Sequence, residues 1–118
     1  PERTVYAITD DGRRELFALR QAILRDTRLR PDPVDLALAY SQDLTEEELR
    51  AVIQDRHGAL AAELESWKQL HEEAEPYLTG LEPAGFDHVI MRLETEVAWH
   101  QKLLDQLAGM LGAERGTP

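Results

Sequence analysis

The sequence predicts a mainly α-helical protein, with a short N-terminal strand remnant and a long antiparallel pair of helices in its C-terminal part. Three observations support this fold class. Residues 86–111 repeat apolar side chains every three or four positions, residues 45–75 repeat them behind a strong helix start, and only residues 1–9 alternate as a strand does. The expected helices therefore span about 10–24, 33–40, 45–75 and 84–111.

Composition narrows the class of protein. The 118 residues are 42% hydrophobic and 31% charged, which is typical of one helical domain with a modest core. The absence of cysteine excludes disulfides, thiolate metal sites and a thiol nucleophile. No apolar run approaches the length of a membrane span, and the first residues do not form an export signal. We therefore expect a cytoplasmic protein without a membrane partner.

Charge is unevenly distributed along the chain, whose net charge is -10. Residues 1–30 carry seven arginines against five acidic residues, a net charge of +2. Residues 31–118 carry six basic and eighteen acidic residues, a net charge of -12, and this part would repel a phosphate backbone. Any contact with nucleic acid is therefore expected from the first thirty residues or from outside this chain.

The first element is the expected strand over residues 1–9, in which Val5, Tyr6 and Ile8 supply β-branched and aromatic side chains. A single strand is not stable by itself. Its hydrogen-bonding partner is expected before Pro1, so we expect this chain to be part of a longer protein, cut inside a β-hairpin.

The second element is a helix over residues 10–24. Thr9 can cap its free N–H groups, and two aspartates follow where the helix dipole favours negative charge. Arg13, Arg14 and Arg20 lie away from the apolar stripe, where they either face solvent or contact phosphate groups beside a groove. The apolar stripe consists of Leu16, Phe17, Leu19 and Ile23.

Residues 25–33 carry charge and two prolines, which predicts a linker before a short helix at 33–40. Thr45 and Glu48 then fit a capping box that starts a long helix. Pro76 is expected to end this helix. Its apolar side consists of Leu49, Val52, Ile53, Leu60, Leu64, Trp67, Leu70 and Ala74.

The last helix carries the longest apolar stripe, with a period of about 3.5 residues and a length of about 39 Å. The short link at 79–83 makes it antiparallel to the helix before it. Val89, Leu103 and Met110 widen the stripe, so that it can face that helix and a second subunit at once. The predicted dimer interface consists of Phe86, Ile90, Leu93, Val97, His100, Leu104, Leu107 and Leu111.

Catalytic and metal-binding patterns are weak. Glu75 stands where a zinc-protease helix starting at His71 needs its second histidine. Neither His71 nor His100 follows a glutamate at the spacing of a di-iron bundle. Neither Ser41 nor Ser66 lies in a glycine-rich turn. We therefore expect no enzyme, no cofactor and no metal, with a small metal- or ligand-binding bundle as the remoter alternative.

Trp67 and Trp99 are the large aromatic residues of the two long helices. They either pack in the core or an interface, or line a pocket for a flat apolar ligand. His100 follows Trp99 within the stripe, where a polar residue can fix the register of a helix pair or contact that ligand. Trp67, Trp99 and His100 are the predicted effector pocket.

The segment Tyr6–Leu16, with Ile8-Thr9, Gly12-Arg13 and Leu16 in place, resembles the end of the wing and the following helix of winged helix-turn-helix regulators. The PadR family fits better than the MarR-type regulators. The basic, Pro-containing residues 1–6, the linker Arg30–Pro33 before a short helix, and the two long helices are each similar to its layout. The specific part of the resemblance covers residues 3–16.

This resemblance implies a homodimeric transcriptional regulator, usually a repressor, whose C-terminal helices dimerise and in some members bind a small aromatic molecule. The helix-turn-helix would precede residue 1, so operator DNA would be bound only through that missing part. Among residues of this chain, Arg3, Thr4, Arg13 and Arg14 are the expected phosphate contacts.

The implied domains are the end of a winged helix at 1–24, a linker at 25–33, a helical dimerisation and effector domain at 34–112, and a flexible tail at 113–118. A MarR-like fragment or a stand-alone helical dimerisation module is the nearer alternative.

Overall fold

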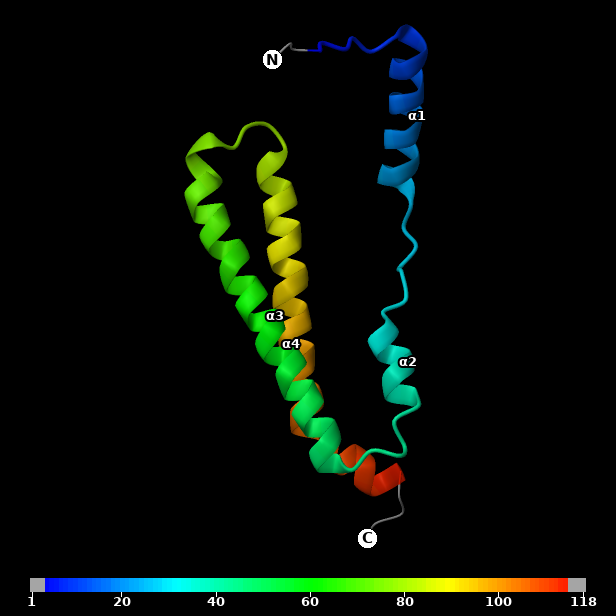
Figure 1. Cartoon of the computed structure of the whole chain (residues 1–118), viewed down its shortest axis with the longest axis vertical. Helices are drawn as coiled ribbons and strands as arrows, with labels where there is room; N and C mark the ends of the chain where they lie inside the picture. The colour runs from blue at the N-terminus through cyan, green and yellow to red at the C-terminus, as the bar shows by residue number, and fades with distance from the viewer. Residues whose placement is uncertain (1–3, 115–118) are drawn as a thin grey trace. The chain divides into compact units, whose positions relative to one another are not determined.

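The computed structural model describes residues 4–114 and confirms the mainly helical prediction (Figure 1). Its elements are α1 (Asp10–Arg25), α2 (Pro33–Ala39), α3 (Glu46–Ala74), a 3₁₀ helix (Glu75–Tyr77) and α4 (Glu82–Glu114). None of the helices in residues 4–114 is both long and apolar enough to cross a membrane. The chain divides into two compact units, residues 1–36 and 37–118.

The strand expected over residues 1–9 is not present in its described part. Residues 4–9 have no regular secondary structure, and residues 4–114 contain no strand that could pair with them. Without a partner, the backbone N–H and C=O groups of one strand have no ladder to join. Residues 1–3 lie outside the described part of the chain.

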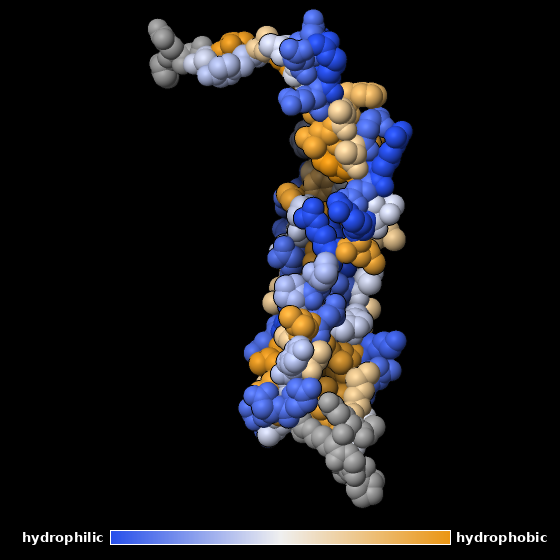
Figure 2. Space-filling view, turned by 90° about the vertical axis from the view of Figure 1, so that its right-hand side faces the viewer, coloured by the Kyte–Doolittle hydropathy of each residue, from blue (hydrophilic) through white to orange (hydrophobic). Residues whose placement is uncertain are grey.

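In the first unit, α1 starts as the sequence indicates. The Thr9 hydroxyl accepts a hydrogen bond of 3.0 Å from the Gly12 N–H. A Cβ at position 12 would lie 3.0 Å from a side-chain carbon of Ile8 and 3.2 Å from the Thr9 hydroxyl oxygen, so a larger residue would crowd this cap. The helix buries none of its side chains: Leu16 is 50% exposed and Ile23 is 64% exposed. Apolar side chains accordingly lie at the surface of this helix in Figure 2.

The second unit is built on a hairpin in which α3 and α4 pack along each other (Figure 1). The predicted capping box is confirmed: Thr45 accepts a hydrogen bond from the Glu48 N–H, and the Glu48 carboxylate accepts one from the Thr45 N–H. This cap fixes where α3 begins, one residue after Thr45, because it satisfies N–H groups that have no partner inside the helix.

The link between α3 and α4 is shorter than expected, because α4 begins at Glu82. Pro83 is tolerated in this first turn, where a missing N–H has no cost. The Glu82 carboxylate accepts hydrogen bonds from the N–H and the hydroxyl of Thr79, at 3.1 and 2.9 Å. Gly80 makes the turn with a φ of 58°, a backbone conformation that glycine adopts without strain. At its other end α4 extends to Glu114, so the expected tail at 113–118 begins as helix, and residues 115–118 lie outside the described part.

The hydrophobic core of the described residues lies near the open end of the hairpin. Leu38, Leu44, Trp99 and Leu111 pack around the core cluster and are partly buried. Leu64 is buried farther along α3. The core cluster consists of Leu49, Ile53, Leu103, Leu104 and Leu107. This narrow core positions the polar groups and hollows described next.

Candidate functional site

The apolar stripe of α4 faces α3 and the hydrophobic core. Its buried members are His100, Leu104 and Leu107, and the other five are half-buried. Phe86 makes an edge contact with the Trp67 ring, with centroids 5.8 Å apart. The stripe therefore has its first partner inside the chain, and its contact with a second subunit stays a prediction.

His100 is the most buried polar side chain of the described residues, with 1% of its surface exposed. The Arg56 Nε–H donates to His100 Nε2 over 2.8 Å, so this nitrogen accepts and carries no proton. His100 Nδ1 lies 2.6 Å from the Glu96 carbonyl oxygen and donates to it. The imidazole thus has both nitrogens satisfied in its neutral form and connects α3 to α4.

A second polar cross-link lies one turn away. Arg50 donates from Nη1 to the Leu104 carbonyl over 3.1 Å and from Nη2 to Glu46 over 3.0 Å. Both cross-links use arginines of α3 that the sequence analysis did not single out. Arg56 stays exposed while its Nε–H reaches His100, and Arg50 is half-buried, so no spacing in the sequence distinguishes them from the solvent-facing arginines.

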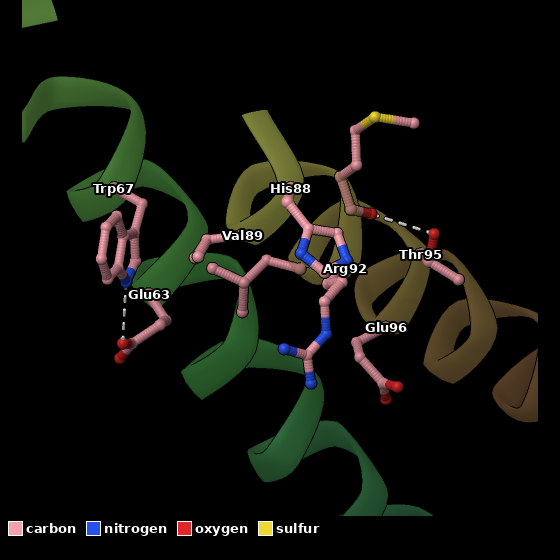
Figure 3. Close-up of a pocket in the computed structure, with 9 residues that line it drawn as sticks. Glu63, Trp67, His88, Val89, Arg92, Thr95 and Glu96 are labelled. Carbon is pink, nitrogen blue, oxygen red and sulfur yellow. Dashed lines mark hydrogen bonds between the residues drawn. The ribbon is translucent and has the colours of Figure 1, made fainter. Parts of the chain in front are cut away.

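One hollow lies between α3 and the N-terminal half of α4 and has a volume of about 530 Å³ (Figure 3). Trp67 forms one wall, and its Nε1–H donates to Glu63 over 3.3 Å. The Val89 side chain lies between Trp67 and Arg92 in this view. The lining residues are Glu63, Trp67, His88, Val89, Met91, Arg92, Leu93, Thr95 and Glu96. We call this hollow the Trp67 groove.

The second hollow lies beside the core, near the C-terminal end of α4, and has a volume of about 420 Å³. Lys102 is the one charged side chain among its described lining residues. The lining residues are Leu38, Leu49, Trp99, Lys102, Leu103, Gln106, Leu107, Met110 and Leu111. We call this hollow the Trp99 hollow; most of its described lining residues are apolar and none of them is acidic.

Both hollows lie on one side of α4. Successive residues of a helix are turned by roughly 100° about its axis. Positions 89, 96, 103 and 110 each precede a stripe residue, so they lie about 100° around the helix from the contact with α3. We call this side the outer flank of α4; it consists of Val89, Arg92, Glu96, Trp99, Leu103, Gln106 and Met110, and each of these residues lines one of the hollows.

The predicted effector residues are divided between these places. Trp99 and His100 are in contact, with ring centroids 4.8 Å apart and planes at 88°. Trp67 lines the other hollow, and His100 lines neither of the two. The structure therefore brings Trp99 and His100 together but does not bring Trp67 to the same hollow.

The expected phosphate contacts lie at the start of the first unit. Arg14 forms an ion pair with Asp11, and Arg13 and Thr4 are exposed. Arg3 lies outside the described residues. Arg20 lies over the Phe17 ring, with 5.9 Å between the guanidinium carbon and the ring centroid.

Other clusters offer no further candidate. Within residues 4–114, no group of three or more His, Asp or Glu side chains is placed to hold a metal ion. Beyond α1, a bidentate contact from Arg28 lowers the pKa of Asp26 below its ordinary value, mainly through the side-chain hydrogen bond. Comparisons of the chain with models of known protein families, with curated proteins and with solved structures find no match.

Proposed function

We propose that this chain is the C-terminal dimerisation and effector-sensing part of a PadR-like DNA-binding transcriptional regulator, acting as a repressor. The resemblance of residues 3–16 to the end of a winged helix supports the family. The charge distribution supports a role of residues 31–118 in dimerisation instead of DNA binding, because this acidic part suits protein contacts better than phosphate contacts.

The observation that carries the dimer is the Trp99 hollow on the outer flank of α4. The described part of the chain buries only six apolar side chains, whereas Met110 at the edge of this hollow stays 51% exposed. The described lining residues of this hollow are mostly apolar and none of them is acidic, so it can receive apolar side chains from a second copy. We therefore propose that the second subunit packs over the outer flank, next to the stripe that α3 occupies.

Analytical ultracentrifugation tests this proposal. The unmutated chain is expected to sediment as a dimer. Met110→Asp should weaken dimerisation roughly 100- to 1,000-fold, because a two-fold interface would desolvate one carboxylate from each subunit at about 2 kcal/mol apiece.

Leu81→Asp is the matched control, because Leu81 is 87% exposed beside the start of α4 and lines neither hollow. Circular dichroism should show the same helix content for both variants. If the unmutated chain is a monomer, or if the two variants dimerise equally well, the proposal that the outer flank is the interface is wrong.

A further inference from the structure

The hydrogen bonds of His100 require its imidazole to be neutral. The ring is 1% exposed, its Nε2 accepts the Arg56 Nε–H over 2.8 Å, and its Nδ1–H donates to the Glu96 carbonyl over 2.6 Å. A proton added to Nε2 would turn this acceptor into a donor. Two N–H groups would then point at each other, and a buried imidazolium would lie against a guanidinium. The bond that connects α3 to α4 at this point therefore cannot coexist with a protonated ring.

The charged groups around His100 oppose a further positive charge. α3 is the helix that packs along α4, and it presents Arg56 to Nε2 and, farther along, Arg50 to the Leu104 carbonyl. On α4 itself, a Glu96 carboxylate oxygen lies 3.9 Å from Nδ1. The Glu96 side chain is 43% exposed, so water screens its attraction for an imidazolium. It also faces Nδ1, which already carries a proton, and so cannot relieve the conflict at Nε2.

We propose that the bond between His100 and Arg56 is a proton-sensitive cross-link, which joins α3 to α4 above the titration range of histidine and breaks when the ring takes up a proton. Histidine in an unfolded chain is half protonated near about pH 6.5. Below this pH the unfolded chain binds one more proton than the hairpin, so the hairpin loses stability as the pH falls. The imidazole edge also contacts Trp99, so the broken cross-link frees one wall of the Trp99 hollow. All these contacts lie within one hairpin, so the inference does not depend on the proposed function.

Nitrogen-15 NMR of the imidazole groups tests the protonation state in the whole chain. At about pH 7.5, above the half-protonation of free histidine, His100 is expected to carry its proton on Nδ1 and none on Nε2. The signal is assigned by its loss in His100→Gln. A proton on Nε2 of His100 at this pH, in a neutral or a charged ring, would overturn the inference.

Urea unfolding at one fixed protein concentration tests the consequence for stability. The unfolding equilibrium constant of the unmutated chain should rise roughly three- to tenfold between about pH 7.5 and 5.5, where the upper value is one proton fully excluded from the folded state. His100→Gln should lose this rise, because an amide does not titrate in this range. His88→Gln is the matched control, the same change at an exposed histidine of α4, and should keep the rise. An equal rise in the unmutated chain and in His100→Gln, or greater stability at the lower pH, would contradict the proposal.

A second variant tests the role of the guanidinium and does not depend on the folding of His100→Gln. In Arg56→Gln the new amide oxygen can accept a proton from Nε2, so the rise should shrink to less than about twofold. Arg50→Gln is its control, because it removes the other arginine that bonds to α4 and leaves His100 and its partners in place. Circular dichroism at the higher pH establishes that each variant folds. If Arg56→Gln and Arg50→Gln show the same rise, Arg56 does not make the hairpin sensitive to protons and the inference is wrong.

Discussion

Leu107→Ala tests whether the α4 stripe is the core of the hairpin. Leu107 is 3% exposed and belongs to the core cluster with residues from both long helices. Truncation of a buried leucine to alanine costs about 2.7 to 5 kcal/mol, depending on how far the site can relax. Leu107 also lines the Trp99 hollow, so the new space would join an existing one of about 420 Å³ instead of forming a closed cavity. We therefore expect a cost in the lower part of this range, about 3 kcal/mol.

The assay is urea unfolding followed by circular dichroism at 222 nm, at one fixed protein concentration because dimerisation would add to the apparent stability. For a domain of this size, the same loss lowers the melting temperature by roughly 12 to 24 °C. Leu70→Ala is the control: Leu70 lies on α3 and is 47% exposed, so its truncation should cost less than about 1 kcal/mol. Equal costs for the two variants would refute the placement of the stripe against α3.

Three further predictions follow from the caps and the charge distribution. Thr45→Ala should destabilise the hairpin by about 1 kcal/mol in the same urea assay, because the Glu48 N–H loses its acceptor. The control is Thr95→Ala in the middle of α4, which should leave the free energy of unfolding nearly unchanged. The hydrogen bonds from the Thr79 hydroxyl and N–H lower the pKa of Glu82. Their stabilisation of the fold is therefore complete above the unfolded-state pKa of Glu82, and it is lost as the pH falls through the folded-state pKa. Thr79→Val should raise the Glu82 pKa in an NMR titration. The chain alone should bind a DNA duplex no more tightly than about 10⁻⁴ M at physiological salt in fluorescence anisotropy, and micromolar binding would contradict the charge argument.

The helices themselves could be predicted because their signals are local. Thr45 and Glu48 are three residues apart, and the pairing of the two long helices needs only a short link and two apolar stripes. The error at the start of α4 was also local, since Pro83 was assigned to the link although proline is favourable in a first turn.

The site could be predicted only in part, because it depends on contacts between residues far apart in the sequence. The bond between Arg56 and His100 spans 44 positions, and that between Arg50 and Leu104 spans 54. The relative rotation and register of two helices decide which arginines face inward, and an apolar pattern leaves this choice open. Trp67 contacts Phe86 near the start of α4, whereas Trp99 lies 13 residues farther along that helix, so the two side chains line different hollows.

The contacts between the two hollows connect the proposed effector sensing to the proposed dimerisation. Glu96 lines the Trp67 groove, its carbonyl oxygen accepts the His100 Nδ1–H, and the edge of that imidazole contacts Trp99, which lines the other hollow. A ligand that shifts this turn of α4 would therefore move side chains in the proposed interface. Thermodynamic linkage makes such an effect reciprocal: a molecule bound in the Trp67 groove should change the dimer dissociation constant by the same factor as dimerisation changes the affinity for that molecule. A common factor different from one, measured by sedimentation with and without the molecule, would show that the two hollows are coupled, whereas a factor of one would mean that they act independently.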